Sequence, residues 1–546
     1  MSVTKRGLMT LIVVALVLIA CGGKQPEPGD APIAVSEGQE TMREVTGTEA
    51  EEALTEPVVE EAEQVEVTRV AVEPVATQAP PGYEGEVAPA PTPPPDNFFR
   101  DYGVNPYVDA NVDNLSTFSL DVDTGAYTVA RRYVRDGIMP PAEAVRVEEF
   151  VNYFDQGYAA PPDVAFAIYA DGAPSPFHND GSYILRVGVQ GYDVPQAQRL
   201  PANLTFVVDV SGSMARESRL ELVKGALQML LDGLRSDDTV SLVVYGSNAR
   251  VILEPTAASE RDRILSAIYS LQPEGSTNAE AGLRLGYQMA NSAYRSEGIN
   301  RVILASDGVA NVGLTDPDGL AAEIRRLADG GIQLTTIGVG MGNFNDVLME
   351  QLADQGDGHY AYVDTMSEAH RVFVEELTGT LQVIALDAKV QVDFNPQVVR
   401  QYRLIGYENR AVADQDFRND AVDAGEIGAG HTATALYAVQ LHDGATGRLG
   451  TVQLRWRDPQ TGQVQEINGN VNTWDLSASF EESDAHYQLA VVVAQYAELL
   501  RNSYWAGDAT YAELAARAGN LSARLSGDEK VTEFNSLVQQ TVSLRR

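Results

Sequence analysis

The fold of this chain is decided by the stretch LTFVVDVSGS, residues 204–213. It begins with an apolar run, ends in small polar residues, and leads directly into a segment with helical periodicity at residues 220–234. An apolar strand followed by a polar turn and a helix is the repeating unit of parallel sheets that are covered on both faces. The stretch therefore predicts the first strand of an α/β domain, with Asp209, Ser211 and Ser213 at its carboxyl end.

The same alternation of apolar runs and amphipathic stretches continues to residue 381. The predicted strands are Leu204–Val210, Val240–Tyr245, Val251–Leu253, Val302–Ala305, Leu334–Val339 and Tyr360–Val363. The predicted helices are Leu220–Leu234, Arg261–Leu271, Ala279–Ala293, Gly319–Ala328, Asp346–Ala353 and Ser367–Leu381. This order indicates a doubly wound, mostly parallel sheet of the α/β class. If the short third run is an edge hairpin, the strands that end near Asp209 and Asp307 are neighbours.

Carboxylates and hydroxyls gather at the expected carboxyl edge of this sheet. The candidate metal ligands are Asp209, Ser211, Ser213, Thr277 and Asp307. Such an all-oxygen set suits Mg²⁺, with Mn²⁺ as the second candidate, and the lack of nearby histidine or cysteine disfavours zinc. We therefore predict a magnesium site. The competing interpretation is that Asp209 and the serines only cap the following helix.

The pattern Asp209-x-Ser211-x-Ser213, together with Thr277 and Asp307, resembles the metal-ion-dependent adhesion site (MIDAS) of the von Willebrand factor type A (VWA) domain. The resemblance implies that the two serines and Thr277 bind the metal directly, while the two aspartates act mostly through water. It also implies that the bound ion captures a carboxylate of another protein.

Segments on both sides of this domain resemble bacterial YfbK-type VWA lipoproteins. The resemblance rests on residues 105–106, 115–124, 145–154, 404–410 and 423–431. It implies three parts, which are an N-terminal α+β extension at residues 98–200, the VWA domain at 201–383, and a β-rich then helical domain at 384–546. The extension is expected to pack against the rest of the chain. Within the flanks, the hydrophobic pattern predicts one helix over residues 142–154 and a strongly amphipathic helix over 487–500.

The N-terminal region predicts export and lipid attachment. Residues 8–20 are almost wholly apolar but span roughly 20 Å as a helix, less than the hydrocarbon core of a bilayer, so residues 1–20 are interpreted as a signal peptide. The sequence LIAC, residues 18–21, resembles the bacterial lipobox, which implies a lipid on Cys21. The competing interpretation is an ordinary signal peptide with a chance cysteine. In the lipobox family, Gly22 favours the outer membrane of a Gram-negative cell.

Residues 21–97 are acidic and proline-rich and are interpreted as a disordered tether. The whole chain has 77 Asp and Glu against 39 Lys and Arg, a formal net charge of −38. This balance excludes nucleic acid as a partner, because binding its backbone needs clustered basic residues. A P-loop is missing as well, so nucleotide binding is not expected.

These observations favour a lipid-anchored protein of the bacterial cell envelope that is not an enzyme. Its VWA domain would bind an acidic residue of an unknown envelope or surface protein through Mg²⁺, in adhesion or assembly. One alternative is a metal-dependent hydrolase or phosphotransferase that uses Asp209 and Asp307. Another is an envelope scaffold in which the metal is purely structural.

Overall fold

The computed structural model describes residues 97–546, apart from residues 121, 163, 309–316, 343, 377–380 and 546. The predicted signal peptide, the lipidation site Cys21 and the predicted tether up to residue 96 lie outside the described residues. Within the described part of the chain, no helix combines the length and the apolarity that a membrane crossing requires.

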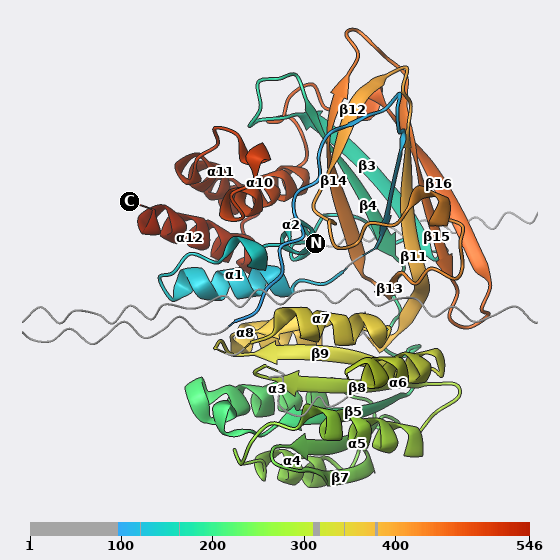
Figure 1. Cartoon of the computed structure of the whole chain (residues 1–546), viewed down its shortest axis with the longest axis vertical. Coiled ribbons are helices and arrows are strands. Elements are labelled where there is room, and N and C mark those ends of the chain that lie inside the picture. The colour runs from blue at the N-terminus through green and yellow to red at the C-terminus, as the bar shows by residue number, and fades with distance from the viewer. Residues whose placement is uncertain are drawn as a thin grey trace, which may run out of the picture. The chain divides into compact units, whose positions relative to one another are not determined.

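A six-stranded sheet carries the predicted metal residues (Figure 1). Its strand order is β10–β9–β8–β5–β6–β7, and all neighbouring strands are parallel except β6 and β7. The strands are β5 Ala202–Asp209, β6 Thr239–Tyr245, β7 Ala249–Ala257, β8 Ile299–Ser306, β9 Gln333–Val339 and β10 Tyr360–Val363. The predicted doubly wound, mostly parallel α/β fold is confirmed, and β5 lies beside β8 as expected.

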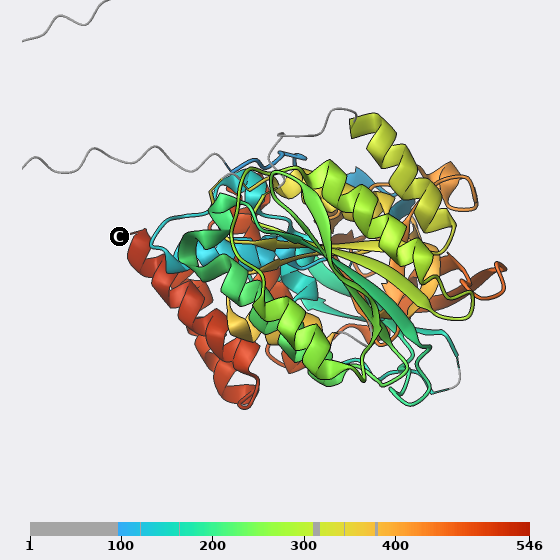
Figure 2. The same ribbon diagram turned by 90° about the horizontal axis from the view of Figure 1, so that it is seen from below.

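Helices cover both faces of this sheet (Figure 2). They are α3 Arg219–Gly233, α4 Arg261–Tyr269, α5 Ala279–Ser292, α6 Pro317–Asp329, α7 Asp346–Gln355 and α8 Met366–His370. On β5, Phe206 packs in the core formed with α3, α4 and α8, whereas Val207 packs in the core formed with α5, α6 and α7. Burial on both faces explains why these strands are almost continuously apolar. The helix predicted over residues 367–381 is found as α8 followed directly by the π-helical turn η3, Arg371–Glu375, and its residues 377–380 lie outside the described residues.

Strands from both flanking segments form two further sheets. One has the order β1–β12–β14–β4–β3, and the other has the order β13–β11–β15–β16 with β2 also paired to β11. The strands are β1 Val108–Asp109, β2 Leu115–Ser119, β3 Phe166–Pro174, β4 Tyr183–Gly191, β11 Val383–Phe394, β12 Val399–Ile405, β13 Gly425–Gly428, β14 Thr432–Leu441, β15 Arg448–Arg457 and β16 Val464–Asn472. The two sheets share one apolar core, so they form a β-sandwich. Because β4 pairs with β14, the N-terminal extension packs against the C-terminal segment, as predicted.

A helical layer completes the flanking region. It consists of α1 Gly125–Arg135, α2 Val147–Asn152, α10 Ala485–Leu500, α11 Tyr511–Arg524 and α12 Glu529–Leu544. Short 3-10 helices lie at Ala142–Ala144, Gly212–Ser218, Asp414–Asp416, Thr473–Asp475 and Tyr504–Ala506.

Of two helix predictions in this layer, one was wrong in its extent, and the other is confirmed as a helix but was wrong in its amphipathic character. Residues 142–154 do not form one helix, because Val145 and Arg146 are extended, and the Arg146 side chain instead reaches Asp346 of α7 (Nη1 to Oδ2, 2.6 Å). The helix α10 is buried on nearly all sides rather than amphipathic, because it packs in one core with α2, α11 and α12.

Candidate metal centre

Two predicted site residues, Asp209 and Asp307, stand at the ends of neighbouring strands. β5 ends at Asp209, and Asp307 directly follows Ser306, the last residue of β8. Because these strands are adjacent and parallel, both carboxylates lie at the carboxyl edge of the sheet. The Ser306 hydroxyl donates a hydrogen bond to Asp209 Oδ2 (2.9 Å) and ties the two strand ends together.

Ser211 and Ser213 connect the two carboxylates. The Ser211 N–H donates to Asp209 Oδ1 (2.7 Å), and the hydroxyl oxygens of Ser211 and Ser213 are 3.0 Å apart. The Ser213 hydroxyl in turn donates to Asp307 Oδ1 (3.0 Å). Ser211 is the residue before the following 3-10 helix, yet its side chain makes no capping hydrogen bond. The interpretation that these residues only cap a helix therefore has no support in the structure.

The loop that contains Thr277 forms a third side of this group. The Gly212 N–H donates to the carbonyl oxygen of Gly275 (3.2 Å), which holds the loop against the serine segment. Thr277 is half-buried and directly precedes Asn278, the residue that caps α5. In the described part of the chain, the Thr277 hydroxyl makes no hydrogen bond to the other predicted ligands, so its oxygen is available to an ion.

Arg219, which the sequence analysis missed, also belongs to this group. Its Nη1 donates to Asp307 Oδ2 (2.7 Å) and its Nη2 donates to the carbonyl oxygen of Met341 (2.5 Å), while the residue is only 3% exposed. Arg219 is the first residue of α3, where the helix dipole disfavours a positive charge. A positive charge at the start of a helix was therefore the signal in the sequence that an acidic side chain of the same chain lies nearby.

The backbone before Arg219 adopts an unusual conformation. Glu217 and Ser218 both have left-handed backbone angles, with φ of 50° and 59°. Non-glycine residues in this region are strained by about 1–3 kcal/mol each and cluster at functional sites. The left-handed conformations of Glu217 and Ser218 direct the start of α3, and with it the Arg219 guanidinium, towards Asp307.

The residues of this group fit a hard divalent cation. Asp209 is fully buried, and burial together with the charge of Asp307 raises its pKa to about 6, although hydrogen bonds from Ser211 and Ser306 oppose the shift. Among the described residues, Arg219 pairs with Asp307 but no basic side chain pairs with Asp209. A divalent ion would supply that missing positive charge, and hydroxyl and carboxylate oxygens are the ligands it prefers.

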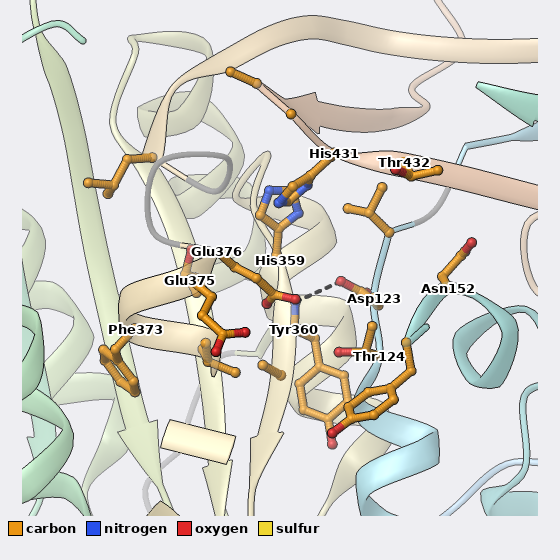
Figure 3. A pocket seen from close by; sticks show the side chains of 18 of the residues that line it. Asp123, Thr124, Asn152, His359, Tyr360, Phe373, Glu375, Glu376, His431 and Thr432 are labelled. Atoms are coloured by element: carbon orange, nitrogen blue, oxygen red, sulfur yellow. Dashed lines mark hydrogen bonds between the residues drawn. The ribbon is translucent and has the colours of Figure 1, made fainter. Parts of the chain in front are cut away.

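A separate cavity of about 460 Å³ lies between the sheet and the flanking segments (Figure 3). The rings of His359 and His431 face each other there with centroids 5.4 Å apart, and the Tyr360 N–H donates to Asp123 Oδ1 (2.9 Å). Within the described residues, His359 Nε2 and His431 Nδ1 have no hydrogen-bond partner. The predicted metal residues do not line this cavity, so it is distinct from the metal centre.

Family models match nearly all of the described chain. The model of the von Willebrand factor type A domain matches residues 203–376, and a model described as von Willebrand factor matches residues 94–185. The model of the C-terminal region of the uncharacterized protein YfbK matches residues 379–447 and 442–544.

Two curated relatives share this likeness over large parts of their length. The uncharacterized protein YfbK of Escherichia coli (strain K12) is 36% identical over 444 residues, which cover 76% of each chain. The uncharacterized protein sll0103 of Synechocystis is 27% identical over 291 residues, which cover 52% of this chain and 68% of that protein. Among solved structures, von Willebrand factor type A from Catenulispora acidiphila aligns with a TM-score of 0.41 and 16% identity, covering 69% of this chain and 90% of that one.

The fold and the matched family models define a protein that contains a VWA domain, a domain that points to protein–protein interaction or adhesion. More narrowly, the chain belongs to the family of the VWA protein YfbK.

Proposed function

We propose that this protein is a lipid-anchored component of the bacterial envelope whose VWA domain binds another protein through Mg²⁺. The observation that carries the proposal is the chain of oxygen atoms from Asp209 through Ser211 and Ser213 to Asp307, beside the Thr277 hydroxyl. The three hydroxyls are the proposed direct ligands, and the two carboxylates are proposed to act mostly through water. Mn²⁺ is the second candidate for the ion.

The charges of the site favour an acidic partner. Two carboxylates, the Arg219 guanidinium and a divalent ion sum to a formal charge of about +1, which attracts a further carboxylate in a poorly solvated site. The chain as a whole carries −38, so it repels acidic proteins at long range. We therefore propose a partner that presents its carboxylate within a basic surface.

The proposed location rests on the sequence alone. A lipid on Cys21 would anchor the chain, with the outer membrane as the first candidate, and the tether at residues 21–97 would hold the VWA domain away from the lipid surface. Labelling with an alkyne fatty acid, compared between wild type and Cys21→Ala, tests the anchor. Equal labelling of both chains would contradict it.

A matched pair of variants tests the metal centre. Thr277→Val removes a proposed ligand while keeping the shape of the side chain, and Ser276→Ala removes the neighbouring hydroxyl, which lies 3.5 Å from the Ser247 hydroxyl instead. Removing support from a metal ligand typically lowers affinity about 10–100-fold, and we expect at least this loss of Mg²⁺ affinity in Thr277→Val by calorimetry. Ser276→Ala should bind like wild type. Equal affinities in all three proteins would refute the assignment of Thr277.

The partner is tested by cross-linked pull-down of the full chain from envelope fractions, with Mg²⁺, with Mn²⁺ and with EDTA. We expect proteins captured by wild type and Ser276→Ala to be lost in EDTA and in Thr277→Val. An identical set of captured proteins in every arm would contradict metal-mediated binding. A phosphoester panel run on the same samples separates the hydrolase alternative, because turnover that disappears in Asp307→Asn would replace binding with catalysis as the function.

A further inference from the structure

A second group of carboxylates lies at the opposite end of the VWA sheet from the metal centre. Asp357 stands between α7 and β10, while Asp423 lies just before β13 of the sandwich and Glu426 lies within it. One carboxylate oxygen from each of the three residues lies within 4.8 Å of the other two. Because β10 runs parallel to β9, β8 and β5, the loop before it is at the amino edge, far along the strands from Asp209.

Glu426 is the member of this group that points to a ligand. It is only 7% exposed, and in the described part of the chain its carboxylate has neither a hydrogen-bond donor nor an ion-pair partner. Burial, followed by the charges of Asp357 and Asp423, raises the pKa of Glu426 well above its usual value. Burial and Asp423 likewise raise the pKa of Asp357 to about 7. A buried carboxylate that faces other carboxylates is costly unless a cation joins it.

The arginines around this group pair with other acids. Arg457 binds Asp387 (2.6 Å) and Arg410 binds Asp354 (2.8 Å). Among the described residues, Arg457 forms no ion pair with Asp357, although its charge acts on that carboxylate from a distance. Arg325 approaches Asp423 at 3.6 Å on the exposed side. The buried Arg301 feels the charge of Glu426 but forms no ion pair with it within the described residues. The carboxyl end of α7 at Gln355, which carries the negative pole of the helix dipole, adds to the excess of negative potential.

We propose that Asp357, Asp423 and Glu426 bind a hard divalent cation, Ca²⁺ or Mg²⁺, that joins the VWA domain to the β-sandwich. The spacing fits a single ion, because two oxygens that each lie about 2.4 Å from a calcium ion are at most about 4.8 Å apart. Asp423 is exposed and gives the ion a route from solvent, whereas Glu426 is the buried anchor. This site is independent of the proposed function, since it shares no residue with the Asp209 group.

The first experiment counts ions bound per chain by equilibrium dialysis, with Ca²⁺, Mg²⁺ and Mn²⁺ in separate arms. Asp209→Ala is expected to lower the affinity of the metal centre about 10–100-fold or more, because it removes a carboxylate that supports the ion through water. An ion that still binds tightly therefore belongs elsewhere. We expect one ion per chain in Asp209→Ala in the Ca²⁺ or the Mg²⁺ arm, and none when Glu426→Gln is added. Glu482→Gln, which removes one exposed acid, is the matched control and should leave that ion in place. No ion in Asp209→Ala, or one that survives Glu426→Gln, would overturn the proposal.

The second experiment uses thermal unfolding in the same Asp209→Ala background, with EDTA and with the cation that binds. Glu426→Gln removes a buried repulsive charge, so without metal it should unfold at the same or a higher temperature than its parent. With the cation at saturation the parent should gain about 2–4 °C or more, and Glu426→Gln should gain nothing. An ion site predicts that Glu426→Gln is as stable as its parent or more stable without the cation, and less stable than the parent with it. A folding defect would lower the unfolding temperature in both conditions. Equal gains in both proteins would refute the site. The pull-down result for Thr277→Val tests the proposed function only, so it does not affect the outcome of the dialysis or the unfolding experiment.

Discussion

Two of the buried junctions between the VWA domain and its flanking segments differ in how their carboxylates are neutralised. At the first junction, the Arg131 side chain of α1 is 2% exposed and forms ion pairs with Asp364 and with Glu368 (2.9 Å to the latter). Glu368 also accepts a hydrogen bond from Arg371 (2.7 Å). At the second junction, the carboxylate of Glu426 lies close to those of Asp357 and Asp423, and it forms no ion pair within the described part of the chain.

The pKa shifts show what this difference means. Burial alone would raise the pKa of Glu368, but Arg371 and Arg131 lower it below its usual value, so this carboxylate stays charged. Burial raises the pKa of Glu426 and the neighbouring acids raise it further. A buried carboxylate needs an arginine, a proton or a metal ion. The first junction uses arginine. The second junction therefore needs a proton or a metal ion.

The largest effect is expected at the arginine junction. Arg131→Met keeps much of the apolar volume but leaves Asp364 and Glu368 short of positive charge, and breaking a buried pair in this way typically costs about 3–5 kcal/mol. We expect a loss of this size in the free energy of unfolding, measured by urea denaturation at pH 7. Arg131→Lys, which keeps the charge, should lose less. A loss below about 1 kcal/mol in Arg131→Met would show that the junction is not held by this arginine.

The buried pair His359 and His431 extends the comparison from buried acids to buried bases. Burial, with further contributions from Arg301 and Arg371, lowers the pKa of His431 to about 4, and burial lowers the pKa of His359 well below its usual value. Both pKa values lie below that of an unfolded histidine, about 6.5. The unfolded state therefore binds more protons, and stability falls as the pH drops from about 6.5 towards 4, by up to about 1.4 kcal/mol per pH unit for each histidine.

This prediction is measured as the difference between wild type and His431→Gln across that pH range, because carboxylates elsewhere titrate in both proteins alike. We expect the wild type to lose stability more steeply than the variant. Parallel curves would mean that His431 becomes protonated in the folded protein without penalty.

The sequence predicted the parts that depend on local pattern. The strands β5, β6, β8, β9 and β10 are buried on both faces, so their apolar runs marked them within a few residues. The exception is β7, predicted as residues 251–253 but spanning Ala249–Ala257, because an antiparallel edge strand has alternating exposed residues that interrupt the apolar run. Asp209 and Asp307 were also predictable as neighbours, because each follows a strand and the strand order can be inferred from the alternation of strands and helices.

The parts that were missed depend on contacts between segments. The role of Arg219 exists only because the loop at Met341 approaches α3. The acids Asp357 and Glu426 are separated along the chain and meet only when the sandwich docks on α7 and β10. In the same way, the apolar stripe of α10 suggested one exposed face, whereas helices from both ends of the chain cover it on nearly all sides.

The smallest effect is expected where an ion pair is exposed. Glu217 accepts from Arg132 at 3.1 Å and lies 3.8 Å from Arg219, but its side chain is 47% exposed. If burial decides the worth of an ion pair, Glu217→Gln should cost less than about 1 kcal/mol in urea denaturation and leave Mg²⁺ affinity within about twofold of wild type. A loss above about 2 kcal/mol, or a marked drop in Mg²⁺ affinity, would mean that Glu217 stabilises the buried Arg219–Asp307 pair through the strained turn. In that event exposure alone would not decide how much an ion pair contributes, and Glu217 would have to be counted as part of the metal centre.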